Sequence, residues 1–474
     1  ANSGLVRAAL LAGVMLLFVG ESAGIQIHST ALQGIGIGMY QKELKKDLES
    51  TFDDQADIAH SRPIAERINW LFGIADRHSK EYSSPEAWLS RERYGALHPT
   101  HILALKCMDG RINLPVATGT PTGIIHPFRN LGGMFDLGWP HLGEVIVESV
   151  SKAAKRGQQT LVFITYHYSK GDTHRGCAGF EYNTDAARRH AFDIKTQFEK
   201  VFGGGHGTVY PLVCGFETDE DAMILHSCGA TADGNGEILN MADVADDGTV
   251  TDQERAAVAA GNDELTNALF ANRARCTLPP RLASMFPDMP MQTRSDLLPI
   301  LLGNLEHIAM IRRRVSLEAQ EAAISRERST EKEGKDVAGH ATKIISPLTK
   351  LCSSYNHREW AICIGRGFDW LHVPNIALII GPYSPDLSDP IRKAASILQN
   401  NMKGGRAPPD GFLLLACAPY DEPGVDHSRA VLKANFLRKF AVEVIRKEFP
   451  ELASRMTERT CVLNWGSRAL ERLD

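Results

Sequence analysis

Two cysteines and two histidines have the residue types and the spacing of a zinc site. Each of two apolar runs that read as buried strands ends in one candidate ligand, Cys107 for the first run and His167 for the second. His174 and Cys177 follow within a loop's length of His167. Two thiolates and one imidazole, with the fourth position left to water, form the ligand set of a catalytic Cys₂His zinc site. The sequence therefore predicts zinc bound by Cys107, Cys177 and either His167 or His174.

Two charged residues beside the first cysteine indicate what such a site would do. The chain reads Cys107-Met108-Asp109-Gly110-Arg111, with a turn expected at Gly110. Asp109 is close enough in sequence to accept a hydrogen bond from a zinc-bound hydroxide and to direct its lone pair toward a substrate. Arg111 would hold that carboxylate ionised and oriented through a bidentate pair. We interpret Asp109 and Arg111 as the catalytic residues of a zinc hydrase.

The elements around these residues predict a parallel α/β unit. The run before Cys107 is followed by a Gly/Pro/Thr-rich loop, by an amphipathic helix expected over 142–154, and by the strand that ends at His167. A strand–helix–strand crossover makes the two strands parallel, so their carboxyl ends lie at one edge of the sheet. That arrangement would bring Cys107 and His167 together. A helix over 184–202 and a hairpin over 209–226 are expected next.

The residues after His357 repeat this order of elements. Strand-like runs at 360–366 and 411–420 flank a helix expected over 390–402. The segment 360–366 resembles 103–109 in its pattern of apolar residues. A duplicated α/β unit is the favoured interpretation.

The ligand positions are not repeated in the second copy. Pro419 aligns with His167, and Arg429 aligns with Cys177. The second copy is therefore expected to be degenerate, with no metal site of its own.

These motifs resemble those of the β-class carbonic anhydrases. The resemblance rests on Cys107-x-Asp109-x-Arg111, on the segment Arg129-Asn130-Leu131-Gly132 and on the later His/Cys pair. The duplicated unit with one inactive copy and a helical lead-in resembles more particularly the carboxysomal shell carbonic anhydrase branch. The resemblance implies a mainly parallel α/β fold flanked by helices and a zinc-dependent, reversible hydration of CO2 to bicarbonate.

The resemblance leaves the histidine ligand open. The usual β-class spacing is His-x-x-Cys, which His174 and Cys177 satisfy. In the carboxysomal branch the ligand lies further upstream, at a strand end, which fits His167. A strand end also fixes a side chain more rigidly than a loop does, which favours His167. The other histidine would then be a supporting group or a proton shuttle.

The chain of 474 residues is too long for a single core. The expected division is an apolar N-terminal segment at 1–38, a helical domain at 39–97, the catalytic zinc-binding α/β domain at 98–229, an acidic loop with a helical insert and charged linker at 230–355, and the degenerate second α/β domain at 356–474. Within the fourth part, Asp243–Glu254 approximates a calcium loop in which Ala245 removes one ligand. A solvated acidic loop is the favoured reading of that stretch.

Composition and the N-terminus bear on partners and location. A formal net charge of −5 provides no basic field for nucleic acid. Nine cysteines, an odd number, show no small-domain disulfide pattern.

The apolar run at 8–20 fits a signal peptide, a short anchor or a buried helix. The first two would mean export or membrane anchoring, whereas the resemblance implies a cytoplasmic microcompartment. A homodimer or larger assembly is expected, with membrane or shell association through the N-terminal region.

Two other functions stay open from the residues alone. One is hydrolysis of a related small molecule such as carbonyl sulfide. The other is a non-catalytic, zinc-containing scaffold that presents the helical domain to an assembly. Hydration activity that is lost on replacing Asp109 while zinc persists would separate the enzyme from the scaffold.

Overall fold

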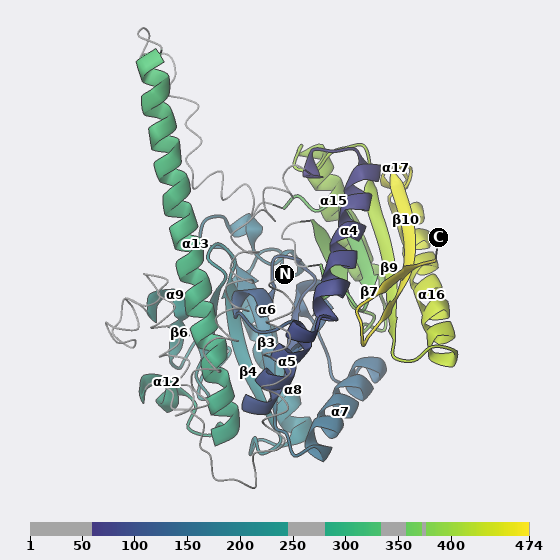
Figure 1. Cartoon of the computed structure of the whole chain (residues 1–474). Helices are drawn as coiled ribbons and strands as arrows, with labels where there is room; N and C mark the ends of the chain where they lie inside the picture. Colours follow the sequence, from purple (N-terminus) through teal and green to yellow (C-terminus); the bar gives the residue numbers. More distant parts are fainter. Residues whose placement is uncertain (1–58, 245–279, 333–356, 372–375, 474) are drawn as a thin grey trace, which may run out of the picture. The chain divides into compact units, whose positions relative to one another are not determined.

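A computed structural model describes residues 59–244, 280–332, 357–371 and 376–473 (Figure 1). All of them belong to one compact unit, Thr51–Asp474. The apolar segment at 1–38 and most of the Asp243–Glu254 loop lie outside the described residues. Within the part of the chain that is described, no helix is both long and apolar enough to cross a membrane.

The first sheet has six strands in the order β2-β1-β3-β4-β5-β6. Their bounds are β1 His101–Cys107, β2 Ile125–Asn130, β3 Thr160–Tyr168, β4 Val209–Glu217, β5 Ala222–His226 and β6 Ile238–Asn240. The strands β1 to β4 pair in parallel, whereas β5 and β6 continue the sheet in antiparallel fashion. The predicted crossover between β1 and β3 is confirmed. Cys107 and His167 consequently lie at the same edge of this sheet.

The second sheet has five strands in the order β11-β10-β9-β7-β8. Their bounds are β7 Ala361–Gly365, β8 Ala377–Ile380, β9 Phe412–Tyr420, β10 Met456–Asn464 and β11 Leu470–Arg472. Parallel pairing joins β8, β7, β9 and β10, and β11 is antiparallel to β10. Read from β8, this order repeats β2-β1-β3-β4-β5 of the first sheet. The predicted duplication of the α/β unit is confirmed.

Strand register bears on one detail of the repeat. In each copy the first strand pairs in parallel with the strand that carries His167 or Pro419 near its end. If His167 and Pro419 are equivalent positions in the two copies, then Arg366 is equivalent to Cys107. The similarity of the segments 360–366 and 103–109 instead makes Arg366 equivalent to Asp109. The two alignments of the repeat therefore disagree by two residues, and strand pairing does not allow both. Short apolar runs look alike at several offsets, and only the inter-strand pairing fixes the offset.

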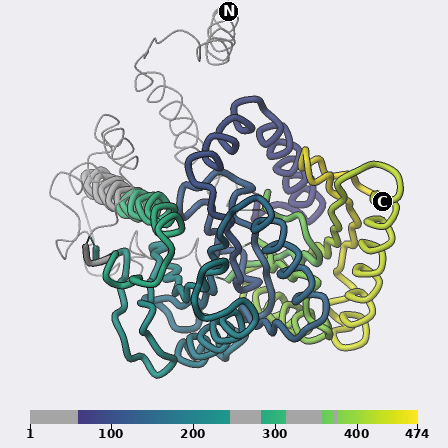
Figure 2. The backbone as a smooth tube through the Cα atoms, turned by 90° about the horizontal axis from the view of Figure 1, so that it is seen from below, coloured from purple at the N-terminus to yellow at the C-terminus, as the bar shows by residue number. Residues whose placement is uncertain are grey.

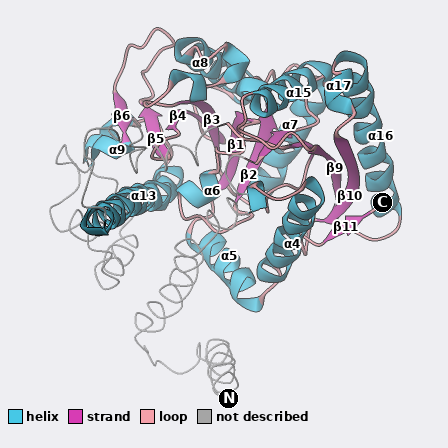
Figure 3. Cartoon of the chain, turned by 90° about the horizontal axis from the view of Figure 1, so that it is seen from above, coloured by secondary structure: helices cyan, strands magenta, loops and turns pink. Residues whose placement is uncertain are grey.

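Helices cover both faces of the strands (Figure 3). Their bounds are α4 Ile64–Tyr82, α5 Pro85–Leu97, α6 Leu114–Ala117, α7 Pro140–Lys155, α8 Thr184–Phe202, α9 Met241–Val244, α12 Pro280–Met285, α13 Met291–Lys332, α15 Ser388–Lys403, α16 Val425–Glu448 and α17 Pro450–Ala453. The helices expected over 142–154, 184–202 and 390–402 correspond to α7, α8 and α15. The charged tract after residue 316 continues α13 as far as Lys332.

Alternate side chains of β1 enter two different cores. Leu103 and Leu105 pack in the cluster that contains the buried faces of α7 and α8. Ile102 and Ala104 pack in the cluster that contains α13 and the strands of the second sheet. Because successive side chains of a strand point to opposite faces, a strand buried on both sides reads as a continuous apolar run. The site at the end of β1 is thus anchored from both faces of the sheet.

Backbone hydrogen bonds join the end of β8, in the second sheet, to the residue after Cys107 and to the end of β2. The backbone N–H of Ile379 in β8 donates to the Met108 carbonyl at 2.8 Å. The N–H of Gly381 donates to the Arg129 carbonyl at 2.9 Å. A Cβ atom on Gly110 would lie only 2.6 Å from the Ala377 carbonyl oxygen. Glycine is therefore required between Asp109 and Arg111 for the second sheet to approach this closely.

The helix α4 packs against the second sheet. The Arg67 guanidinium pairs with Asp410, which also accepts a hydrogen bond from the Ile64 N–H at 2.6 Å. At the other end of the helix, the Ser79 hydroxyl donates to the Ser467 carbonyl at 3.0 Å. α4 contacts β9 and β11, and Figure 2 shows the purple helical segment beside the yellow C-terminal part of the chain. The helical lead-in is thus packed on the second α/β copy.

A buried carboxylate at the end of β4 predicts a pH-dependent stability. Burial, and then the charge of Asp219, raises the pKa of Glu217 to about 7. The unfolded chain ionises Glu217 at its ordinary pKa, so folding is penalised increasingly as pH rises from about 4.5 through 7. Gln at this position carries no charge, so the variant escapes this penalty. We therefore expect the difference in free energy of unfolding between Glu217→Gln and wild type to shift in favour of the variant by about 2 kcal/mol from pH 5 to pH 8. Urea unfolding of both metal-free proteins measures this gain, and an equal difference at the two pH values would contradict it.

Candidate metal centre

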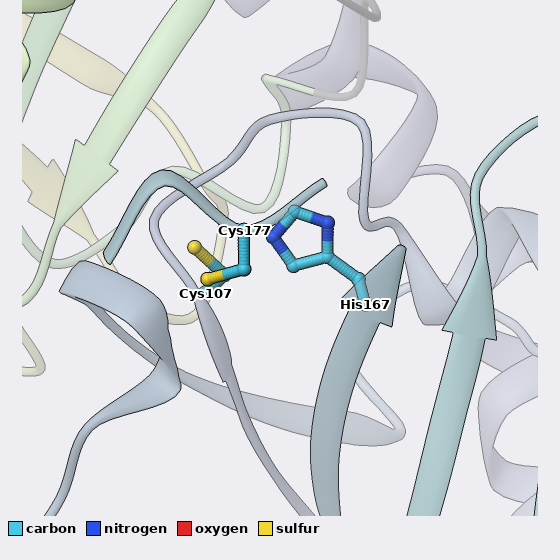
Figure 4. A group of neighbouring side chains, drawn as sticks. All are labelled: Cys107, His167 and Cys177. Carbon is cyan, nitrogen blue, oxygen red and sulfur yellow. The ribbon is translucent and has the colours of Figure 1, made fainter. Parts of the chain in front are cut away.

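Three of the predicted ligands converge at the edge of the first sheet. Cys107 ends β1, His167 lies one residue before the end of β3, and Cys177 precedes the short helix η4, Ala178–Phe180. The ligand atoms of these three residues all lie within 4.8 Å of one another, and all three side chains are buried. Figure 4 shows the imidazole ring of His167 extending from the strand end toward the two cysteines. This arrangement can hold a metal ion.

The chemistry of the three side chains fits a metal centre. His167 is 1 % exposed, and neither ring nitrogen has a hydrogen-bond partner among the described residues. An unpartnered buried polar group costs about 1–3 kcal/mol, which a bound metal ion would remove for one nitrogen. Two sulfurs and one imidazole nitrogen suit zinc in particular.

The contact between the two thiols shifts their pKa values in opposite directions. A hydrogen bond from Cys177, together with the nearby His167, holds the pKa of Cys107 well below its usual range. The same bond and burial raise the pKa of Cys177 well above the usual range. The contact thus makes Cys107 the more acidic thiol of the pair, and the thiolate is the form that binds a metal ion. Binding a metal would release the proton of Cys177.

His174 is not brought into this cluster. Its side chain is 81 % exposed, and Nδ1 lies 3.4 Å from the Asp172 carboxylate. The ring also packs against Tyr182, with centroids 5.5 Å apart. His174 belongs to η3, Thr173–Arg175, on the outer side of the loop that leads to Cys177. Of the two candidate histidines, geometry thus favours His167.

Asp109 and Arg111 form a closed, buried pair. Arg111 Nη2 donates to Asp109 Oδ2 at 2.6 Å, Nε donates to both carboxylate oxygens, and the Arg111 backbone N–H donates to Oδ1 at 2.9 Å. Burial alone would raise the pKa of Asp109, but the guanidinium more than offsets it and holds this pKa below its ordinary range. Asp109 is therefore an ionised acceptor near neutral pH.

Further contacts orient Arg111 from two distant segments. Its Nη2 donates to the Arg175 carbonyl at 2.6 Å and lies 3.3 Å from His357 Nε2. His357 Nδ1 is 3.0 Å from the buried Glu359, which also accepts a hydrogen bond from Asn401. The sequence did not predict a role for His357, because it lies 246 residues after Arg111. In the sequence, His357 stands out only as the residue at which the second copy begins.

The Arg129–Gly132 segment braces the site. Arg129 Nη1 donates to the Asp109 carbonyl at 2.9 Å, and Asn130 Nδ2 donates to the Met134 carbonyl at 2.8 Å. A Cβ atom on Gly179 would lie 2.7 Å from the Gly132 Cα. Two facing glycines therefore let the turn after β2 lie directly against the segment that follows Cys177.

Comparison with known proteins agrees with this geometry. Residues 100–279 match the family model described as Carboxysome Shell Carbonic Anhydrase, catalytic domain. The matched range includes all three clustered ligands and the Asp109–Arg111 pair. No curated protein matches the chain. Residues 100–279 of this chain therefore belong to the carboxysomal branch of the β-carbonic anhydrase superfamily.

Proposed function

We propose that this protein is a zinc-dependent carbonic anhydrase that catalyses the reversible hydration of CO2 to bicarbonate. The observation that carries the proposal is the buried cluster of Cys107, His167 and Cys177 at the same sheet edge as the Asp109–Arg111 pair. The family match over 100–279 supports the same chemistry.

The three clustered residues would hold the metal. Two thiolates from Cys107 and Cys177 would balance the charge of a divalent ion, and the unpartnered ring of His167 would supply the third donor. A zinc ion held there would lower the pKa of a coordinated water to about 7 and so would supply a nucleophile for CO2 at neutral pH.

The role of Asp109 is to orient that nucleophile. Its ionised carboxylate would accept a hydrogen bond from the attacking water and direct a lone pair of that water toward the carbon of CO2. Arg111 keeps the carboxylate ionised and fixed through a bidentate contact, and Arg175 and His357 in turn fix Arg111. The burial of the pair excludes bulk water that would compete for these hydrogen bonds.

Metal removal tests the proposal. We expect the zinc-loaded protein to hydrate CO2 in a stopped-flow assay with a pH indicator, and the chelated protein to lose that activity. Restoring one equivalent of zinc should restore the rate, because the ligands all come from one folded unit. Zinc-loaded protein that shows no hydration would contradict the proposal and favour a scaffold. Parallel assays with carbonyl sulfide would show which substrate is preferred.

A further inference from the structure

The acidic turn between β4 and β5 lies between the metal centre and α13. It comprises Glu217 to Asp221, and its side chains and backbone make contacts in two directions. One set of contacts reaches the loop from Ser169 to Cys177, which we call the ligand loop. The other set reaches the buried part of α13.

Asp219 holds the ligand loop through three kinds of donor. Its carboxylate accepts hydrogen bonds from the Ser169 hydroxyl at 2.9 Å and from the Gly171 N–H at 2.7 Å. The guanidinium of Arg175 pairs with the same carboxylate at 3.1 Å, and the Arg175 side chain is almost fully buried. Glu217 adds an acceptor for the Lys170 N–H at 3.0 Å. Charge-assisted bonds of this kind are about twice as strong as neutral ones.

The ligand loop transmits this contact to the metal centre. It begins two residues after His167 and ends at Cys177. Arg175 connects the two sites, because its side chain contacts Asp219 while its backbone carbonyl accepts a hydrogen bond from Arg111 at 2.6 Å. A displacement of Arg175 would therefore move both the Cys177 sulfur and the partner of Asp109.

The helix α13 holds the same turn from the other side. Asn304, which is fully buried, donates to the Asp221 carbonyl at 2.8 Å and accepts from the Met223 N–H at 3.0 Å. His307 Nε2 lies 2.9 Å from the Asp221 carboxylate. Asp221 has a left-handed backbone with φ of 52°, a conformation that such contacts must maintain.

We propose that Asp219 is a positioning residue for the metal ligand Cys177, and that α13 maintains the turn that presents it. Asp219 does not contact a reacting atom; it fixes the shape of the ligand loop. The residues of α13 act one step further away, through Asp221. This inference rests on the metal centre of the proposed function and adds to it a residue that sets metal affinity.

The first test is Asp219→Asn, which keeps the size of the side chain and removes its charge. We expect its zinc affinity, measured by competition with a chromophoric chelator, to fall by about 10-fold or more, as for other residues that orient ligands. The visible spectrum of the Co²⁺-loaded variant should also change, because that spectrum reports the geometry of the two thiolates. Asp233→Asn, an exposed acid beyond β5, should leave both readouts unchanged.

A second pair of variants tests the contribution of α13. His307→Ala should lower zinc affinity less than Asp219→Asn, and the double variant should lose less than the sum of the two free energies, because both act through one turn. If Asp219→Asn does not fold, Ser169→Ala removes a single donor to the same carboxylate and should weaken zinc binding in the same direction.

The outcomes separate this proposal from the proposed function. Wild-type protein that binds no metal would refute the metal centre itself. A metal-binding wild type combined with an Asp219→Asn variant of unchanged affinity and unchanged Co²⁺ spectrum would refute only the positioning role.

Discussion

Replacing Asp109 with Asn should lower kcat/KM for CO2 hydration by about 10²–10⁴-fold while the protein keeps its zinc. Asn has the size of Asp but presents an amide N–H₂ where Asp109 presents a second acceptor oxygen. The attacking water would lose its orienting acceptor, and Arg111 would lose its charged partner. Stopped-flow hydration measured alongside elemental analysis of the same samples gives both quantities.

The matched control is Asp76→Asn, which removes an exposed carboxylate from α4, far along the chain from the site. It should leave both activity and zinc content unchanged. Full activity in the Asp109 variant would show that another group orients the nucleophile. Simultaneous loss of zinc would show that Asp109 is needed to build the metal site and would leave its catalytic role unsupported.

His167→Ala should lower zinc affinity strongly, whereas His174→Ala should leave it unchanged. Removing His167 deletes one of three clustered ligand atoms. Zinc affinity should therefore fall more than it does when a residue that only orients a ligand is replaced, a loss of about 10–100-fold. Removing His174 takes away an exposed ring that contacts Asp172 and Tyr182, so affinity should not change. Chelator competition on both variants measures the two affinities.

The pair of histidine variants is its own control, because both change the same residue type within one stretch of chain. The result that contradicts the account is loss of zinc in His174→Ala with retention in His167→Ala. Such an outcome would mean that the ligand loop rearranges on metal binding to present the His-x-x-Cys pair.

The sequence was sufficient to predict the positions of the candidate ligands on the fold. Apolar runs identified the strands that end at Cys107 and His167, and parallel crossover geometry implies that such ends meet. The choice between His167 and His174 was not decided by spacing, since both lie within reach of Cys177. It depends on which ring turns inward, and only the fold shows that the His167 ring is buried whereas the His174 ring is exposed.

Contacts between distant segments were beyond what the sequence could predict. His357 reaches Arg111 from the second copy, and Asp219 reaches the ligand loop from a hairpin turn. Neither contact leaves a local pattern, because each depends on how two separately formed elements pack. The two alignments of the repeat disagree by two residues for a similar reason: the apolar residues around Arg366 fit several alignments, and only the pairing of β7 with β9 reveals the conflict.

The most direct test of the central claim is X-ray absorption at the zinc edge of the zinc-loaded, full-length protein. Coordination by Cys107, Cys177 and His167 predicts two sulfur atoms at about 2.3 Å and two nitrogen or oxygen atoms at about 2.0 Å, one of them an imidazole nitrogen and the other from water. A shell without sulfur, or one filled by three or four sulfurs, would contradict the proposed centre and with it the assigned chemistry.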